Sequence, residues 1–230
     1  MGAIHLIRHG QASFGSDDYD RLSPLGVEQA EVLGLSLRRR IPAVDRVVCG
    51  GMRRHAQTAE GALGAMGLPC RWDDDRNWME YDHVAVLAAY QPRWADQAAM
   101  MREFAALPNA RQAFQAEFGK AMQRWVGGLH NDDYPESWAG FCARVDRALT
   151  ELHTSLGKSQ TALVFTSGGP ITAVIQRMLH LSDENAFRLN WTLANAAISK
   201  LIYSSHALNL STVNDHAHFE GEHARLITYR

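Results

Sequence analysis

The sequence predicts an α/β protein with an open, three-layer sheet that is mostly parallel, with helices on both faces and a helical insertion. In the first third of the chain, short apolar runs alternate with longer segments of helical periodicity, and this pattern resumes after the middle of the chain. Residues 81–157 instead lack strand signals and are rich in Ala, Met, Gln, Phe and Trp at helical spacing. With 230 residues, 46% of them hydrophobic and 21% charged, the chain can bury a substantial core. Because repeats, low-complexity tracts and linkers are missing, we expect a single domain over residues 1–230.

The first elements are predicted in the order strand, helix, strand, helix. Ala3–Ile7 is an apolar run of the length of a buried strand. A helix is expected from Pro24 to Arg40, because Ser23 is a good N-cap, Pro suits the first helical position and leucines recur at helical spacing. Val44–Cys49 is the second predicted strand, and a second helix is expected over residues 52–66. This order is typical of a parallel sheet with crossover helices.

The rest of the chain divides into the insertion and a return to the sheet. Residues 81–157 are predicted as a helical insertion that ends in a long helix from about Ser137 to Leu156. Four large apolar residues of the insertion could line a lid, although such residues at helical spacing are more often core: Trp94, Met100, Met101 and Phe104. After it we predict a strand at Ala162–Phe165, a helix at Ile171–Leu179, and strands at Ala196–Tyr203, Leu208–Val213 and Leu226–Tyr229.

Charge and cysteine usage exclude several classes of partner. A formal net charge of -2 provides no electrostatic reason to expect nucleic acid or an acidic membrane surface as a partner. The three cysteines are scattered, without a C-x-x-C pair, which favours a reducing compartment over a disulfide framework or a zinc ribbon. The first residues show neither the basic nor the long apolar region typical of a signal peptide, and no apolar stretch approaches the ~18 residues that would span a bilayer. We therefore expect a cytoplasmic protein without membrane or nucleic-acid partners.

Polar residues follow three of the predicted strands at the point where each ends. Arg8-His9-Gly10-Gln11 follows the first strand, and Gly50-Gly51 follows the second, with Arg53-Arg54 in the next helix. Ser167-Gly168-Gly169 follows the strand at Ala162–Phe165. In an open α/β sheet, ligands bind at the carboxyl ends of the strands. Arginines, a histidine and free N–H groups at a helix N-terminus together predict an anion site.

His9 is the candidate nucleophile of this site. The positive charge of Arg8 lowers the pKa of a neighbouring histidine, which leaves a neutral imidazole that can attack phosphorus. The same positive groups would stabilise the charged oxygens of a phosphoryl group in transfer. The residues thus indicate phosphoryl-transfer chemistry.

These segments resemble the motifs of the histidine phosphatase superfamily, also called phosphoglycerate mutase-like. L-I-R-H-G-Q at 6–11 resembles the family's signature. R-R-H-A-Q-T-A-E at 53–60 is similar to its second arginine segment and places Arg54, while W-M-E at 78–80 is similar to the L-x-E segment and places Glu80. P-E-S at 135–137, which opens a helix with Arg144, and N-D-H-A-H-F at 214–219 are similar to further family segments. The set follows the family's order over nearly the whole chain.

The resemblance implies a two-step transfer through a phosphohistidine. His9 would attack the phosphoryl group, Glu80 would protonate the leaving oxygen, and water would then hydrolyse the intermediate. Arg8 and Arg54 would hold the phosphate, so that neither a metal nor another cofactor is needed. Partial burial beside Trp78 could raise the pKa of Glu80 into the working range of a general acid. The expected substrate is a small phosphorylated metabolite.

The sequence departs from the family pattern at Ser167, where the family usually has a second histidine. It also has A-S-F-G where an asparagine is common after R-H-G, and Gly50-Gly51 where S-P is common. Loss of one preorganised donor typically lowers the rate by ~10²–10³, so we predict a phosphatase with reduced activity. Ser167, Gly168 and Ser13 complete the predicted phosphate contacts. His55 is not expected to face the phosphate together with Arg54, because adjacent helix positions point about 100° apart.

Four other interpretations remain open at this point. Ser167 as a hydrolase nucleophile is disfavoured, because Phe165 replaces the first glycine of G-x-S-x-G. A metal site is disfavoured because its candidate ligands lie in a polar segment typical of a solvated surface: Asp215, His216, His218 and His223. A phosphate-binding or regulatory protein with little turnover is the main alternative, and a phosphomutase is a third. Neither a particular substrate nor an oligomeric state follows from the pattern.

Overall fold

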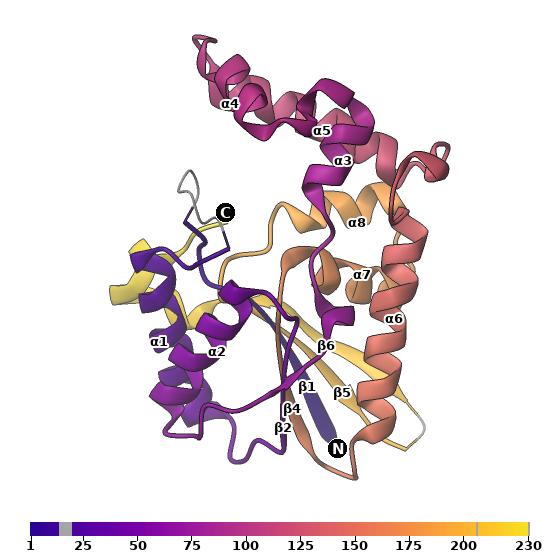
Figure 1. Cartoon of the computed structure of the whole chain (residues 1–230). Coiled ribbons are helices and arrows are strands. Elements are labelled where there is room, and N and C mark those ends of the chain that lie inside the picture. The colour runs from indigo at the N-terminus through magenta and orange to yellow at the C-terminus, as the bar shows by residue number, and fades with distance from the viewer. Residues whose placement is uncertain (14–19, 206, 230) are drawn as a thin grey trace. The chain divides into compact units, whose positions relative to one another are not determined.

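The computed structural model describes residues 1–13, 20–205 and 207–229, and the chain divides into two compact units. One unit consists of Met1–Glu80 and Arg144–Arg230, and the other of Tyr81–Ala143. The first unit contains the sheet and every described residue of the predicted site, whereas the second is helical (Figure 1).

The sheet of the described chain has six strands in the order β3-β2-β4-β1-β5-β6. These are β1 (Gly2–Arg8), β2 (Arg46–Cys49), β3 (Asp73–Asp74), β4 (Thr161–Thr166), β5 (Ile198–Tyr203) and β6 (Leu208–Asp215). β1, β4, β2 and β3 pair in parallel, while β5 pairs antiparallel with both β1 and β6. The predicted open, mostly parallel α/β fold is confirmed.

Helices cover both faces of this sheet. They are α1 (Pro24–Arg40), α2 (Arg53–Met66), α6 (Trp138–Ser155, which begins in the other unit) and α7 (Gly168–Leu179), and α8 (Asp183–Asn190) packs against α7. Figure 1 shows α1 and α2 on one side of the strands and α7 with the later turns of α6 on the other. Between the α1–α2 pair and the sheet, Leu33, Leu37 and Leu63 pack with Ile7 and Phe165 in one buried cluster. This apolar layer holds the carboxyl ends of the strands in place.

The limits of these helices follow from local chemistry. Ser23 caps α1, because its Oγ accepts the N–H of Gly26 at 3.0 Å and leaves Pro24 to open the helix. α2 ends at Gly67, whose φ of 76° lies in the left-handed region that favours glycine. α7 begins at Gly168, three residues earlier than predicted. Pro170 fits in its first turn, because N–H groups there have no acceptor within the helix and the missing N–H of proline costs no hydrogen bond.

The second unit consists of helices and short turns. Its elements are α3 (His83–Tyr90), η2 (Pro92–Ala95), α4 (Gln97–Ala105), α5 (Ala110–Val126), η3 (Asn131–Asp133) and the first turns of α6. Trp94 and Phe104 are buried with ring centroids 5.4 Å apart, and Phe104 contacts Phe114 at the same distance. Met100 is buried as well, whereas Met101 is exposed. Trp94, Met100 and Phe104 therefore serve as core residues of this unit.

The predicted strand at Leu226–Tyr229 is wrong. Leu226 ends a 3-10 turn, η5 (Gly221–Leu226), and residues 227–229 have no regular structure. Two other 3-10 turns complete the unit, η1 (Arg76–Trp78) and η4 (Ala217–Phe219). The Gln29 side chain donates to the Leu226 carbonyl at 2.6 Å, and the Asn195 N–H donates to the Thr228 carbonyl at 2.8 Å. The segment is thus held by loop and side-chain contacts instead of a sheet edge.

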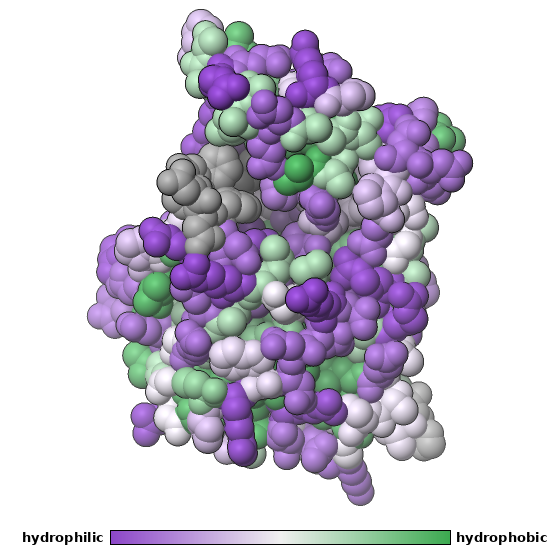
Figure 2. Space-filling view, viewed as in Figure 1, coloured by the Kyte–Doolittle hydropathy of each residue, from purple (hydrophilic) through white to green (hydrophobic). Residues whose placement is uncertain are grey.

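The surface is mostly polar on the face drawn in Figure 2, where small hydrophobic areas lie between hydrophilic ones. None of the helices in the described ranges is long and apolar enough to cross a membrane.

Candidate active site

The parallel register brings the three polar strand ends to one edge of the sheet. β4 lies between β2 and β1, so the residues that follow these strands are neighbours. The His9 N–H donates to the Thr166 carbonyl at 2.8 Å, and the Gly50 N–H donates to the Phe165 carbonyl at 3.0 Å. Ser167 follows directly after Thr166. The structure therefore brings His9, Gly50 and Ser167 together, as the strand-end pattern predicted.

His9 is buried, and one of its ring nitrogens is oriented by the backbone. Its Nδ1 lies 2.7 Å from the Gly10 carbonyl. A carbonyl can only accept, so Nδ1 carries the proton and Nε2 keeps its lone pair. Burial, followed by the charges of Arg54 and Arg8, holds the pKa of His9 well below its usual value. A neutral imidazole with a free Nε2 lone pair is the form that can attack phosphorus.

The loop after β1 is held by three buried polar side chains. Thr58 Oγ1 accepts the Gly10 N–H at 3.1 Å, and Gln29 Oε1 accepts the Gln11 N–H at 2.7 Å. The Asn195 side chain donates to the His9 carbonyl at 3.2 Å. The sequence patterns did not single out these three residues, although Thr58 is part of the R-R-H-A-Q-T-A-E segment that places Arg54. No local pattern marks Gln29 or Asn195, because their partners lie far along the chain.

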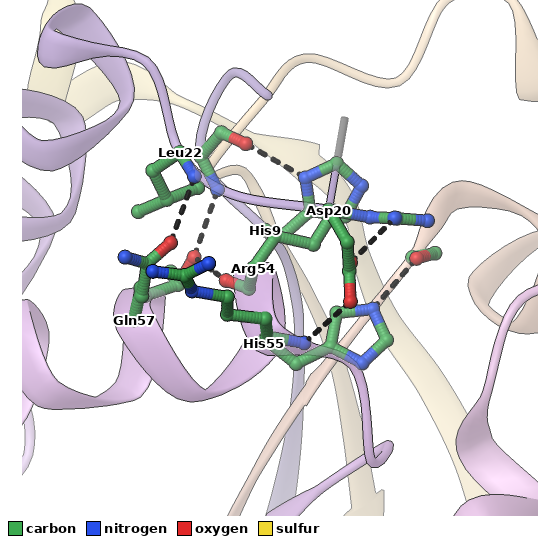
Figure 3. A network of polar contacts seen from close by, with 10 residues as sticks. His9, Asp20, Leu22, Arg54, His55 and Gln57 are labelled. Carbon is green, nitrogen blue, oxygen red and sulfur yellow. Dashed lines mark hydrogen bonds and ion pairs between the residues drawn. The ribbon is translucent and has the colours of Figure 1, made fainter. Parts of the chain in front are cut away.

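Arg54 lies buried in the first turn of α2 and pairs with an acidic residue that the patterns also missed. Its Nη1 contacts Asp20 Oδ1 at 2.8 Å, and Asp20 Oδ2 accepts the Arg53 N–H at 2.9 Å. Figure 3 shows Asp20 beside Arg54 and the rings of His9 and His55. The Asp20 side chain is partly exposed, whereas that of Arg54 is buried. A carboxylate thus occupies one side of the arginine that is predicted to hold phosphate.

Arg8 extends from the end of β1 toward the last residues of the chain. Its Nη1 donates to the Tyr229 carbonyl at 3.2 Å and to the Leu193 carbonyl. Its Nε lies 3.7 Å from the position that a Cβ of Gly168 would take, and Asn190 Oδ1 is only 2.6 Å from that position. The missing side chain of Gly168 therefore leaves room for Arg8 and Asn190 at the start of α7.

Ser167 and His55 form a buried pair. Ser167 is the N-cap of α7 and is fully buried, and its Oγ lies 2.7 Å from His55 Nε2. The His55 ring is also fully buried, with its centroid 5.7 Å from that of His9. The ring thus lies within the site, and that it does not itself face the phosphate together with Arg54 stays a prediction. The ring reaches Ser167 from the first turn of α2, while the longer Arg54 side chain reaches the site from the adjacent position.

Glu80 lies at the end of a segment that two other residues hold against the sheet. Thr166 Oγ1 donates to the Trp78 carbonyl at 2.5 Å, and Arg144 Nη1 donates to the carbonyls of Asn77 and Met79 at 2.9 and 3.0 Å. Glu80 Oε2 accepts the Gly169 N–H, on the first turn of α7, at 3.1 Å. This contact places the carboxylate next to Ser167 and Gly168.

Ser13 makes a local contact. Its Oγ donates to the Leu22 carbonyl at 3.0 Å, and its N–H donates to the Arg21 carbonyl at 2.8 Å. Its role in phosphate binding stays a prediction.

The described residues contain no group of three or more His, Cys, Asp or Glu side chains that could hold a metal ion. In the segment that was the metal candidate, His216 Nδ1 bonds to the Asn214 carbonyl at 2.7 Å, and the His218 ring packs on Phe219 at 4.1 Å. These histidines are engaged by their own segment.

Comparison with known families identifies the class of protein. The family model of the histidine phosphatase superfamily (branch 1) matches residues 4–216. The chain belongs to this superfamily, and the predicted class of enzyme, a phosphatase, is confirmed with it. A comparison with curated protein sequences finds no match.

Solved structures with the same fold include enzymes of phosphate metabolism. A variant of phosphoserine phosphatase from Entamoeba histolytica, in complex with phosphoserine, has a TM-score of 0.65 and 16% identity, over 95% of this chain and 99% of that one. A phosphoglycerate mutase from Bacillus anthracis has a TM-score of 0.63 and 17% identity, over 94% of each chain. A mycobacterial glucosyl-3-phosphoglycerate phosphatase has a TM-score of 0.62 and 22% identity, over 93% of this chain and 98% of that one. At these identities the similarity shows a shared fold.

Proposed function

We propose that the protein is a metal-independent phosphomonoesterase that acts on a small phosphorylated metabolite through a phosphohistidine at His9. The observation that carries the proposal is the neutral His9 ring, with Nδ1 bonded to Gly10 and Nε2 available, between Arg8 and Arg54. The substrate class is supported by the phosphoserine bound to one solved relative and by the name of another, a glucosyl-3-phosphoglycerate phosphatase.

In the first step, the Nε2 lone pair of His9 forms a bond to phosphorus while the bond from phosphorus to the leaving oxygen breaks. Glu80 donates its proton to that oxygen, so that the product leaves as a neutral alcohol. In the second step, a water oxygen bonds to phosphorus, the N–P bond breaks, and Glu80 takes back a proton. Arg8, Arg54 and the N–H groups at the start of α7 stabilise the charge on the phosphoryl oxygens.

The proposal includes reduced turnover. Ser167 presents a neutral hydroxyl at the end of β4, and a hydroxyl donates a single hydrogen bond. A neutral hydrogen bond is roughly half as strong as one made by a charged donor. We therefore expect a slower enzyme than one that has a second imidazole at this position.

The test is to trap the intermediate. The protein is incubated with a phosphomonoester labelled on phosphorus and is quenched separately in acid and in base. We expect label that is stable in base and lost in acid, and we expect neither label nor turnover in His9→Ala. If no acid-labile phosphoenzyme forms, or if His9→Ala keeps full activity, the proposal is wrong.

A phosphate-binding protein with little turnover is the second candidate, and the neutral Ser167 hydroxyl at the end of β4 favours it. A panel of phosphomonoesters tested on the wild type and on Ser167→His separates the two. A strong gain of activity in the variant supports a weakened enzyme. Absence of turnover in both, with phosphorylated ligands that still raise Tm, supports the binding protein.

A further inference from the structure

We infer that His55 is a positioning residue of the phosphate site, which directs the hydroxyl proton of Ser167 toward the phosphoryl group that His9 receives. The inference rests on the proposed function and adds to it a residue that neither the sequence patterns nor the family match assigns. Three features of the structure carry it: the direction of the Ser167 hydroxyl, the space beside Gly50, and the place of the His55 ring.

The Ser167 hydroxyl does not make the hydrogen bond that is usual for a serine at a helix N-cap. A serine N-cap usually accepts an N–H of the second or third helical residue. Ser167 makes no such cap bond; its Oγ lies 2.7 Å from His55 Nε2. The Gly169 N–H, at the second position of α7, donates to Glu80 instead. The hydroxyl is therefore free of the helix end and is held by His55.

The backbone makes room for the His55 ring at a second departure from the family pattern. A Cβ on Gly50 would lie 2.8 Å from His55 Nδ1 and 2.5 Å from the Trp78 carbonyl oxygen. Any other residue at Gly50 would thus displace the imidazole or the Trp78 backbone. Two separate departures, Ser167 at the end of β4 and Gly50 at the end of β2, meet at the same ring. This is the arrangement expected if His55 on α2 supplies the second imidazole of the site, in place of a histidine at position 167.

The third feature is the charge around the ring. His55 lies next to Arg54, and its centroid is 5.7 Å from that of His9. Burial and then Arg54 hold the pKa of His55 well below its usual value, while the Gly50 backbone opposes this. A neutral imidazole has one donor and one acceptor. In the tautomer with the proton on Nδ1, the ring can donate to the Gly50 backbone, and Nε2 accepts the Ser167 hydroxyl proton. In the tautomer with the proton on Nε2, this nitrogen donates to Ser167 Oγ, and the hydroxyl proton points away from His55. A phosphate dianion favours this orientation, because its oxygens accept a hydrogen bond from the Ser167 hydroxyl.

A double-mutant cycle tests the inference on the full-length protein. The quantities to measure are kcat and KM with p-nitrophenyl phosphate, for the wild type, His55→Ala, Ser167→Ala and the double variant. Each single change is expected to lower kcat about tenfold, and the double variant is expected to be no slower than the slower single variant, because the two residues act as one unit. If the two losses multiply, or if His55→Ala matches the wild type, the inference is wrong.

A conservative variant separates positioning from a structural role. Gln retains an N–H donor at about the distance of imidazole Nε2, so His55→Gln is expected to keep activity within about threefold of the wild type. His55→Leu fills similar space without a donor and is expected to be as slow as His55→Ala. Equal activities of the Gln and Leu variants would overturn the inference.

The matched control is His5→Ala. His5 is another buried imidazole, on β1, and lines a separate cavity with Arg40 and Lys200. This variant is expected to lower Tm without changing kcat. A loss of kcat as large as that of His55→Ala would mean that any buried cavity slows the enzyme, and it would overturn the inference.

Failure of the inference is distinguishable from failure of the proposed function. If the wild type forms the phosphohistidine but the cycle shows no coupling, only the inference fails. If the wild type shows no turnover, the proposed function fails, and the increase in Tm on adding vanadate then decides the role of the pair. If vanadate raises Tm equally in the wild type, His55→Ala and Ser167→Ala, the inference is wrong. If the increase in Tm is lost in both variants, the result supports a contact between the His55–Ser167 pair and the bound anion.

Discussion

His9 is the side chain whose chemistry depends most on its surroundings. Burial and two arginines disfavour its protonated form, so the imidazole is expected to stay neutral well below pH 6.5, the usual pKa of histidine. Nuclear magnetic resonance of protein labelled with 15N at histidine reports this directly, with the His9 signals assigned by their loss in His9→Asn. We expect the neutral ring shifts to persist as the pH is lowered through 6.5. A titration of His9 with a midpoint near 6.5 would contradict the environment described here.

Asp20 competes with the substrate for Arg54. Its carboxylate contacts the guanidinium at 2.8 Å and adds negative charge beside an anion site. Because Asp20 is partly exposed, the effect is modest, and Asp20→Asn is expected to lower the inhibition constant for inorganic phosphate about twofold to fivefold. Glu28→Gln, which removes the exposed ion pair with Arg225, is the control and is expected to leave that constant unchanged. Weaker phosphate binding in Asp20→Asn would show that Asp20 orients Arg54 for the ligand.

The segment from Arg76 to Glu80 depends on a contact from helix α6. Arg144 donates to the carbonyls of Asn77 and Met79 and thereby holds the chain just before Glu80. Arg144→Met keeps the length of the side chain but loses these bonds, so we expect kcat to fall about tenfold with little change in KM. Arg147→Met, at an exposed position of the same helix, is expected to be neutral. A change in KM alone would contradict a role through Glu80.

Two glycines on neighbouring helices are expected to respond in opposite ways to alanine. A Cβ on Gly26, in the first turn of α1, would lie 2.2 Å from the Gln11 carbonyl oxygen, so Gly26→Ala pushes the loop that carries His9 and should destabilise the protein by about 2 kcal/mol. A Cβ on Gly64, in α2, meets nothing within 4 Å. Gly64→Ala is expected to stabilise the protein by about 0.5–1 kcal/mol, because glycine loses more backbone entropy.

Urea unfolding of the two alanine variants at neutral pH measures both effects. Equal changes in the free energy of unfolding would show that helix propensity, and not the close approach of α1 to the loop, governs Gly26.

The unit that carries the sheet buries several imidazoles, and this sets its stability against pH. Burial lowers the pKa of His5 and of His218 to about 4, and it lowers those of His9 and His55 as well. Between pH 6.5 and 4 the unfolded chain therefore binds more protons than the folded chain. The contribution of these histidines to the free energy of unfolding is complete above pH 6.5 and is lost as the pH falls toward 4. For His5 or His218 the loss is on the order of 3 kcal/mol when complete.

The measurement is urea unfolding at pH 7.5, 6 and 5, followed in the wild type and in His5→Gln. The free energy of unfolding of the wild type is expected to fall over this range, and the variant is expected to lose less of it. A flat profile between pH 7.5 and 5 would contradict the burial of neutral histidines.

Much of the fold is predictable because its signals are local. The apolar run before Arg8 predicts β1, the Ser23-Pro24 pair predicts the start of α1, and Gly67 marks the end of α2. The alternation of such elements predicts parallel strands, and parallel strands place their carboxyl ends at one edge. For this reason the sequence predicts that His9, Gly50 and Ser167 lie together.

The remaining features depend on contacts between distant parts of the chain. His55 and Ser167 are 112 residues apart, and Asn195 is 186 residues from the His9 carbonyl that it holds. The direction of His55, the partner of Arg54 and the loss of the strand at Leu226–Tyr229 follow from which segments the sheet order makes neighbours. Residue type and spacing act over a few positions of the chain, so they predict the strand ends and the positive charges around His9. Packing acts over the whole molecule, and it alone places an imidazole beside the serine at the end of β4.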